Sequence, residues 1–121
     1  MRVRAGELSD VALDWAVASA QGLLAFGWEN DMGLLDITLS TGEHEYFNPS
    51  LDWAQGGPII ERERIELTYY GDAQGWAAYA GRIVQSAGIG HTPLIAAMRC
   101  YVASKLGDEV DVPDKLVKEA A

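Results

Sequence analysis

The stretch from residue 48 to residue 58 combines several side chains that could do chemistry. It contains a carboxylate, an indole and an amide at Asp52, Trp53 and Gln55, followed by the paired glycines Gly56 and Gly57. Adjacent glycines can let backbone N–H groups approach a ligand closely, as in anion-binding turns. The stretch lacks the lysine and the glycine spacing of nucleotide-binding loops. A simpler interpretation gives these residues structural roles, with Trp53 in the core, Asp52 capping a turn and the glycines permitting tight backbone geometry.

Three charged residues outside this stretch could act with it. Glu61 could form an acid–base pair with Asp52 in a hydrolase, although most domains of this size contain two such carboxylates. Arg62 and Arg99 are isolated cations, and we expect them to pair with carboxylates such as Asp52 or Glu61 rather than to bind a ligand. We assign no catalytic residue. The candidate residues for binding a ligand or partner are Asp52, Trp53, Gln55, Gly56, Gly57, Glu61, Arg62 and Arg99.

The cysteine and histidine content does not suggest a metal site. Cys100 is the only cysteine. The neighbouring Arg99 could lower the pKa of its thiol, but a cysteine with apolar neighbours in a helix is typical of a small buried hydrophobe rather than a nucleophile. His44 lies between Glu43 and Glu45, but neighbours in a strand point to opposite faces. One cysteine and two histidines do not make a zinc set, so we predict no metal and no cofactor.

The charge distribution restricts the classes of partner. The chain of 121 residues has 9 basic and 18 acidic residues, a net charge of -9, and no Lys or Arg between Arg4 and Arg62. Direct nucleic-acid binding is disfavoured, because it requires cations that displace counterions from phosphates. A basic partner is favoured by electrostatic steering, and mimicry of a nucleic-acid backbone is a variant of this idea. The sequence shows no signal peptide and no apolar stretch long enough to span a membrane, so we expect a cytoplasmic protein.

Two amphipathic helices and two hairpins are predicted. Apolar spacing predicts a helix from Leu8 to Gln21 in which Asp10 and Asp14 face water, and a second helix that Thr92 caps and Gly107 ends. Alternating residues predict strands at 35–39 and 65–70, and the turns that follow them predict hairpin partners at 43–47 and 76–80, although the alanines of the last stretch have little strand preference. Loops are expected at 48–58 and over a Gly- and Ser-rich stretch that ends at residue 90, and a short helix is expected from residue 114. These elements indicate an α+β fold, a small antiparallel sheet packed by an N-terminal and a long C-terminal helix in a single domain of residues 1–121.

Two segments carry a resemblance to a known family. The residues from Asp52 to Glu63 and from Thr92 to Gly107, supported by those from Leu13 to Ala18, are similar to the NinX-type proteins of lambdoid phages and prophages. The resemblance implies one NinX-like domain and a phage accessory protein made in the cytoplasm of a bacterial host. The family is of unknown function, so the resemblance brings no reaction or ligand.

We weigh three functions from different classes. The leading one is a non-enzymatic protein that binds a host or phage protein through its acidic half and the region of Trp53. The second is a small-ligand or nucleotide pocket between the Trp53 stretch and the C-terminal helix. Stacking there would come from Trp28, Trp53, Trp76 and Tyr79, and polar recognition from Asp52, Gln55 and Arg99. The third is the carboxylate hydrolase. A homodimer is compatible with the sequence, although no pattern in the residues calls for one.

Overall fold

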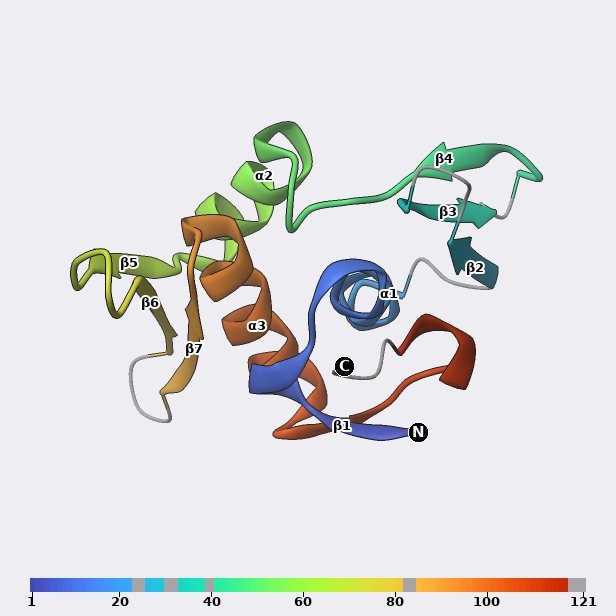
Figure 1. Cartoon of the computed structure of the whole chain (residues 1–121). Coiled ribbons are helices and arrows are strands. Elements are labelled where there is room, and N and C mark those ends of the chain that lie inside the picture. Colours follow the sequence, from blue (N-terminus) through green and yellow to red (C-terminus); the bar gives the residue numbers. More distant parts are fainter. Residues whose placement is uncertain (23–25, 30–32, 39–40, 82–84, 118–121) are drawn as a thin grey trace.

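Three α-helices and eight short strands make up the described part of the chain, which covers residues 1–22, 26–29, 33–38, 41–81 and 85–117 of a computed structural model (Figure 1). The helices are α1 (Asp10–Ala20), α2 (Trp53–Glu63) and α3 (Pro93–Leu106), with 3-10 turns at Ala5–Glu7 and Asp114–Leu116. The strands are β1 (Arg2–Arg4), β2 (Phe26–Glu29), β3 (Leu35–Thr38), β4 (His44–Tyr46), β5 (Glu66–Tyr69), β6 (Trp76–Ala80), β7 (Ser86–Gly90) and β8 (Glu109–Asp111).

The strands form three small antiparallel sheets rather than one. Their orders are β1-β8, β2-β3-β4 and β5-β6-β7, so the predicted α+β class and both predicted hairpins are confirmed. Helix α3 lies along the β5-β6-β7 sheet and against α1, while the β2-β3-β4 sheet lies beyond α1 (Figure 1). The pairing of β1 with β8 brings the two ends of the described chain together, which the sequence had not indicated.

Both predicted helices begin and end close to the expected residues. In α3 the Thr92 hydroxyl oxygen accepts a hydrogen bond from the Ile95 N–H at 3.1 Å, and Gly107 follows the last turn with a φ of 90°. Helix α1 ends before Gly22, whose φ of 70° is the left-handed conformation that stops helices. Leu39, the last residue of one predicted strand, lies outside the described residues. No helix in the described ranges is long and apolar enough to cross a bilayer.

The predicted loop that ends at Gly90 is wrong over its last part, where β7 forms. The inward positions of this strand are glycines, because α3 lies directly on the backbone there. A Cβ on Gly88 would come within 2.3 Å of the Ala96 carbonyl oxygen and 2.5 Å of the Cys100 nitrogen. Glycine therefore serves close helix–strand packing here, although its propensity favours a loop.

The predicted loop at residues 48–58 is confirmed up to Asp52 and wrong from Trp53 on, where α2 begins. Asp52 caps the helix, and its Oδ1 accepts a hydrogen bond from the Ala54 N–H at 2.9 Å. A Cβ on Gly56 would lie 2.4 Å from the Pro49 carbonyl oxygen and 2.6 Å from Leu94 Cδ2. The glycine thus lets the helix pack against the preceding turn and against α3, and its own N–H donates to the Asp52 carbonyl oxygen instead of a ligand.

Candidate functional site

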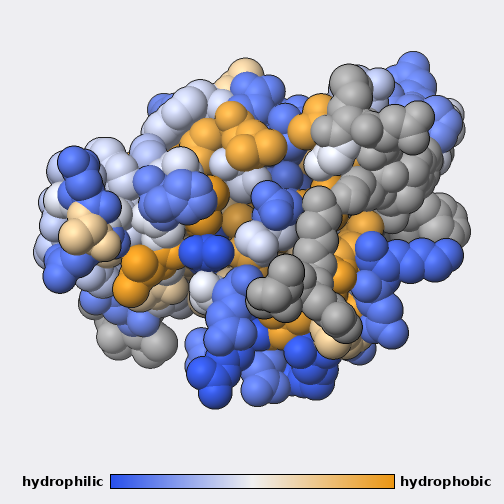
Figure 2. All heavy atoms as spheres, in the orientation of Figure 1, coloured by the Kyte–Doolittle hydropathy of each residue, from blue (hydrophilic) through white to orange (hydrophobic). Residues whose placement is uncertain are grey.

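Three large apolar side chains are exposed within one short segment that runs from the last residue of β4 to the first residue of α2. Tyr46, Leu51 and Trp53 have 52%, 58% and 54% of their surface exposed, and we call these three residues the anchor surface. The prediction that Trp53 fills the core is therefore wrong. Hydrophobic groups reach the surface over the connection from β4 to α2, among hydrophilic neighbours (Figure 2). Exposed aromatic and aliphatic residues grouped in this way are typical of interaction sites.

The segment between the anchor residues is fixed by burial. Phe47, Pro49 and Ser50 turn inward and are buried, and the Phe47 N–H donates to the Leu35 carbonyl oxygen at 2.9 Å. Asn48 and Asp52 are half-buried, whereas Leu51 is exposed. The three anchor side chains consequently project from a backbone that is held in place on its inner side.

Gln55 ties the segment to the first turn of α2. Its Oε1 accepts a hydrogen bond from the Asn48 N–H at 2.6 Å, and its Nε2 donates to the Tyr46 carbonyl oxygen at 2.8 Å. One side chain thus joins the backbone at Tyr46 and Asn48 to the helix that carries Trp53. The sequence suggested that Gln55 makes polar contacts to a ligand, whereas in the structure the oxygen and the nitrogen of its amide both form hydrogen bonds within the chain.

Asp14 fixes the same segment from α1. The prediction that Asp14 faces water is wrong, since only 1% of its surface is exposed and its Oδ1 accepts a hydrogen bond from the Ser50 N–H at 2.9 Å. Burial raises the pKa of the Asp14 carboxyl from 3.8 to about 7, hydrogen bonds from Ser50 oppose the rise, and the nearby Asp10 adds to it. A buried carboxyl thus holds the residue immediately before Leu51.

The surroundings of the anchor surface are acidic. Tyr46 lies directly opposite Asp36 in the β3–β4 ladder, so both side chains are on the same face of that sheet. Oδ1 of Asp36 is buried, accepts no hydrogen bond from the described residues and lies 3.8 Å from Nδ1 of His44. Glu43 and Glu45 are exposed next to and on β4, and strand alternation puts Glu45 on the face of the sheet opposite to Tyr46. Since no Lys or Arg occurs between Arg4 and Arg62, this part of the chain presents negative charge beside apolar groups.

The structure does not bring the predicted acid–base pair together. Asp52 precedes α2 and Glu61 lies near its end, nine positions later, which corresponds to about 13 Å along a helix axis. Asp52 is also engaged as the helix cap. Gly57, the other glycine of the predicted pair, lies within α2 and has room for a side chain, because a Cβ there would meet only Trp53 Cε3, at 3.9 Å.

Arg62 pairs with a carboxylate as predicted, although the partner is Glu63, whereas Arg99 binds backbone carbonyl oxygens instead of a carboxylate. Nε of Arg62 lies 3.0 Å from Oε2 of its neighbour Glu63, whose other oxygen is 3.0 Å from Nζ of Lys105. These cations, Lys105 first, lower the pKa of the Glu63 carboxyl. Arg99 donates from Nε to the Leu8 carbonyl oxygen at 2.8 Å and from Nη1 to the Ile89 carbonyl oxygen at 2.7 Å. Its guanidinium therefore joins α3 to two backbone segments, and its partial burial lowers its pKa.

Cys100 has the structural role that the sequence predicted. It is fully buried, its Sγ donates to the Ser86 carbonyl oxygen at 3.4 Å, and burial raises the pKa of the thiol to about 11. A thiol with so high a pKa is a poor nucleophile. Within the described ranges, no group of three His, Cys, Asp or Glu residues is arranged to hold a metal ion.

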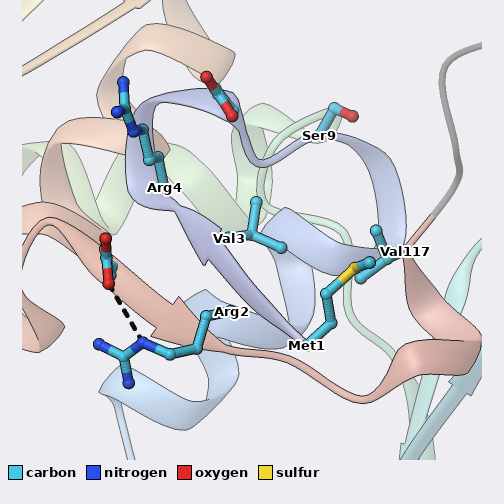
Figure 3. A pocket seen from close by; sticks show the side chains of 8 residues that line it. Met1, Arg2, Val3, Arg4, Ser9 and Val117 are labelled. Atoms are coloured by element: carbon cyan, nitrogen blue, oxygen red, sulfur yellow. Dashed lines mark hydrogen bonds and ion pairs between the residues drawn. The ribbon is translucent and has the colours of Figure 1, made fainter.

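A hollow of about 700 Å³ lies beside β1 and also lacks a catalytic set. Arg2 and Arg4 point to one side of the strand and Val3 to the other (Figure 3). Nε of Arg2 is 3.1 Å from Oε2 of Glu109, so one of the two cations is already paired. The remaining lining residues are Met1, Glu7, Ser9 and Val117. The charges of both signs in this hollow do not favour a particular ligand.

A comparison with protein-family models decides the family. The model described as Bacteriophage P22, NinX matches residues 4–105, which include α1, α2, the anchor surface and all of α3 except its last residue. The chain belongs to this NinX family. The resemblance to NinX-type proteins is thereby confirmed, and the chain is a phage accessory protein by family. No match was found among curated proteins.

Sequence reasoning located part of the NinX anchor surface and missed the rest. Asp52 and Trp53 were expected near a functional surface, but Tyr46 and Leu51 were not. Their exposure depends on which neighbours turn inward, and the short stretch has no periodicity that shows this. Asp14 carried one usable signal, because its spacing from Val11 and Val17 puts it beside the apolar face of α1. Trp28, another expected stacking residue, has a side chain outside the described part.

Proposed function

We propose that this NinX-family chain is a non-enzymatic interaction module that binds a host or phage protein through the anchor surface. The observation that carries the proposal is the joint exposure of Tyr46, Leu51 and Trp53 on a backbone fixed by Gln55 and Asp14. Aromatic anchors on a rigid backbone bind at low conformational cost, because little freedom is lost on association.

The charge next to the anchor surface supports a basic partner. Asp36, Glu43 and Glu45 lie on the neighbouring hairpin, and no Lys or Arg occurs between Arg4 and Arg62. A complementary surface would present apolar side chains for the anchors and Lys or Arg for the carboxylates. Such pairing raises the association rate and weakens as salt rises. The same carboxylates disfavour binding to nucleic-acid phosphates.

Co-purification from phage-infected bacteria tests the proposal. The bait is the full chain at low salt, compared with a Leu51→Ser/Trp53→Ser variant, and chemical crosslinks then locate the contact. We expect a protein with a basic contact segment that crosslinks near residues 46–53, is lost with the double variant and is weakened by salt. The matched control Tyr69→Ser changes an aromatic residue of similar exposure on β5 and should retain the partner. Capture that is equal for all three baits would contradict the proposal.

A further inference from the structure

The β5-β6-β7 sheet has a second face that α3 does not cover. Gly88 and Gly90 point toward α3, where an added Cβ would clash, so strand alternation places Ala87 and Ile89 on the opposite side of β7. The β6–β7 register puts Ala77 opposite Ile89. By the same alternation, the outer sheet face consists of Glu66, Thr68, Ala77, Tyr79, Ala87 and Ile89, with Tyr70 just beyond the end of β5.

This face combines a projecting residue with a hollow. Ile89 is 64% exposed, the highest value among the large hydrophobic residues of the described ranges. Beside it is a hollow of about 400 Å³ lined by Tyr70, Gln74, Trp76, Ala77, Tyr79 and Ile89. Tyr70 and Tyr79 both line this hollow, and a hydrogen bond with Tyr70 raises the pKa of the Tyr79 hydroxyl. In the space-filling view, hydrophobic groups reach the surface over β6 and β7 (Figure 2).

Charge distinguishes the outer sheet face from the anchor surface. In a chain of net charge -9, the outward positions of β5, β6 and β7 include one charged residue, Glu66, opposite Tyr79. Two like-charged copies repel each other least where their surfaces carry few charges. The carboxylates beside the anchor surface oppose self-contact there, whereas the outer sheet face permits it.

We propose that a second copy of this chain covers the outer sheet face in a two-fold symmetric dimer. In such a contact Ile89 of each copy enters the hollow of the other, because an isologous interface uses the same patch twice. Arg64 and Glu66 form no ion pair among the described residues, so Arg64 of one copy can pair with Glu66 of the other. This proposal does not depend on the anchor surface binding a partner.

The size of the face predicts weak association. Three strands of about five residues form a face of roughly 14 by 17 Å. The area of this face is smaller than the ~800 Å² that each partner buries in a standard stable interface. The dimer should therefore form at high micromolar concentration and dissociate on dilution.

Sedimentation velocity from about 10 μM to about 500 μM tests the dimer. We expect the weight-average mass of the wild type to rise toward twice the monomer value, while Ile89→Glu stays at the monomer mass. The matched control is Leu51→Glu, a similarly exposed site on the anchor surface, which should associate like the wild type. Circular dichroism checks that both variants are folded. A wild type that stays monomeric throughout, or an Ile89→Glu variant that still dimerises, overturns the proposal.

A charge exchange tests the two-fold arrangement. Arg64→Glu should weaken dimerisation, and Arg64→Glu/Glu66→Arg should restore it, because the exchanged pair re-forms across the two-fold axis. If the double variant is weaker than the single one, the assigned geometry is wrong.

Discussion

Replacing Asp14 by Asn tests whether a buried carboxyl fixes the anchor surface. The Asn side chain keeps an oxygen for the Ser50 N–H, and its amide can donate to the Ser50 hydroxyl. The substitution therefore removes only the ability of the side chain to ionise. The hydrogen bond of 2.9 Å is thus retained while the charge is lost.

The expected magnitude follows from the difference between the folded and unfolded pKa. Asp14 titrates at about 7 when folded and at 3.8 when unperturbed, and each unit corresponds to about 1.4 kcal/mol. Between these values the folded state binds one more proton than the unfolded state, so the free energy of unfolding falls as pH rises. Ionisation of the buried Asp14 therefore lowers the free energy of unfolding by at most about 4 kcal/mol above pH 7, and this destabilisation disappears below about pH 4. Asp14→Asn abolishes the destabilisation, because the amide does not ionise.

Urea unfolding between about pH 4 and pH 8 measures the effect. Relative to the wild type, Asp14→Asn should gain up to about 4 kcal/mol in unfolding free energy from the low to the high end of this range. Glu7→Gln is the control at an exposed carboxylate that precedes α1, and its difference from the wild type should stay within about 0.5 kcal/mol. Parallel pH curves for Asp14→Asn and the wild type would refute the reasoning, because Asp14 would then titrate alike in both states.

Other substitutions test the packing around α2 and α3 by denaturant unfolding. Gly56→Ala should destabilise the fold by about 1–3 kcal/mol, because its Cβ would meet the backbone, whereas Gly57→Ala should stabilise it by up to about 1 kcal/mol; equal effects would contradict the assigned packing. Gly88→Ala should lower the free energy of unfolding by about 1–3 kcal/mol, because α3 must move away from β7. An unchanged free energy of unfolding would contradict the close approach of α3 to β7. Gln55→Ala should cost about 1–3 kcal/mol and speed amide hydrogen exchange at residues 46–51, and unchanged exchange would show that Gln55 does not order the segment.

The sequence predicted elements whose signals are local. The caps of α3 at Thr92 and Gly107, the two-residue alternation of β3 and β5, and the turn before β6 need no information from distant residues. Helix α2 and strand β7 were missed because their glycines normally indicate loops. Here Gly56 and Gly88 are required by backbone from other elements, which approaches within 2.6 Å of the added Cβ. Such a requirement is tertiary and leaves no periodic pattern.

The candidate site was predicted in part for the same reason. The stretch from Asp52 to Gly57 was identified, but its residues were assigned to the wrong roles because α2 was not recognised. Asp14 and Ser50 lie 36 residues apart, and their pairing decides which way Leu51 points. A contact of that range cannot be inferred from one sequence.

Selection of peptides on the immobilised chain tests most directly whether the anchor surface binds proteins. The library displays segments of bacterial and phage proteins, and bound peptides are mapped by hydrogen exchange. We predict enrichment of peptides that combine Lys or Arg with aromatic or aliphatic residues, protection of residues 46–53, and loss of binding for Leu51→Ser/Trp53→Ser. Enrichment that persists unchanged in this variant, or no enrichment at low salt, would contradict an interaction role for these residues.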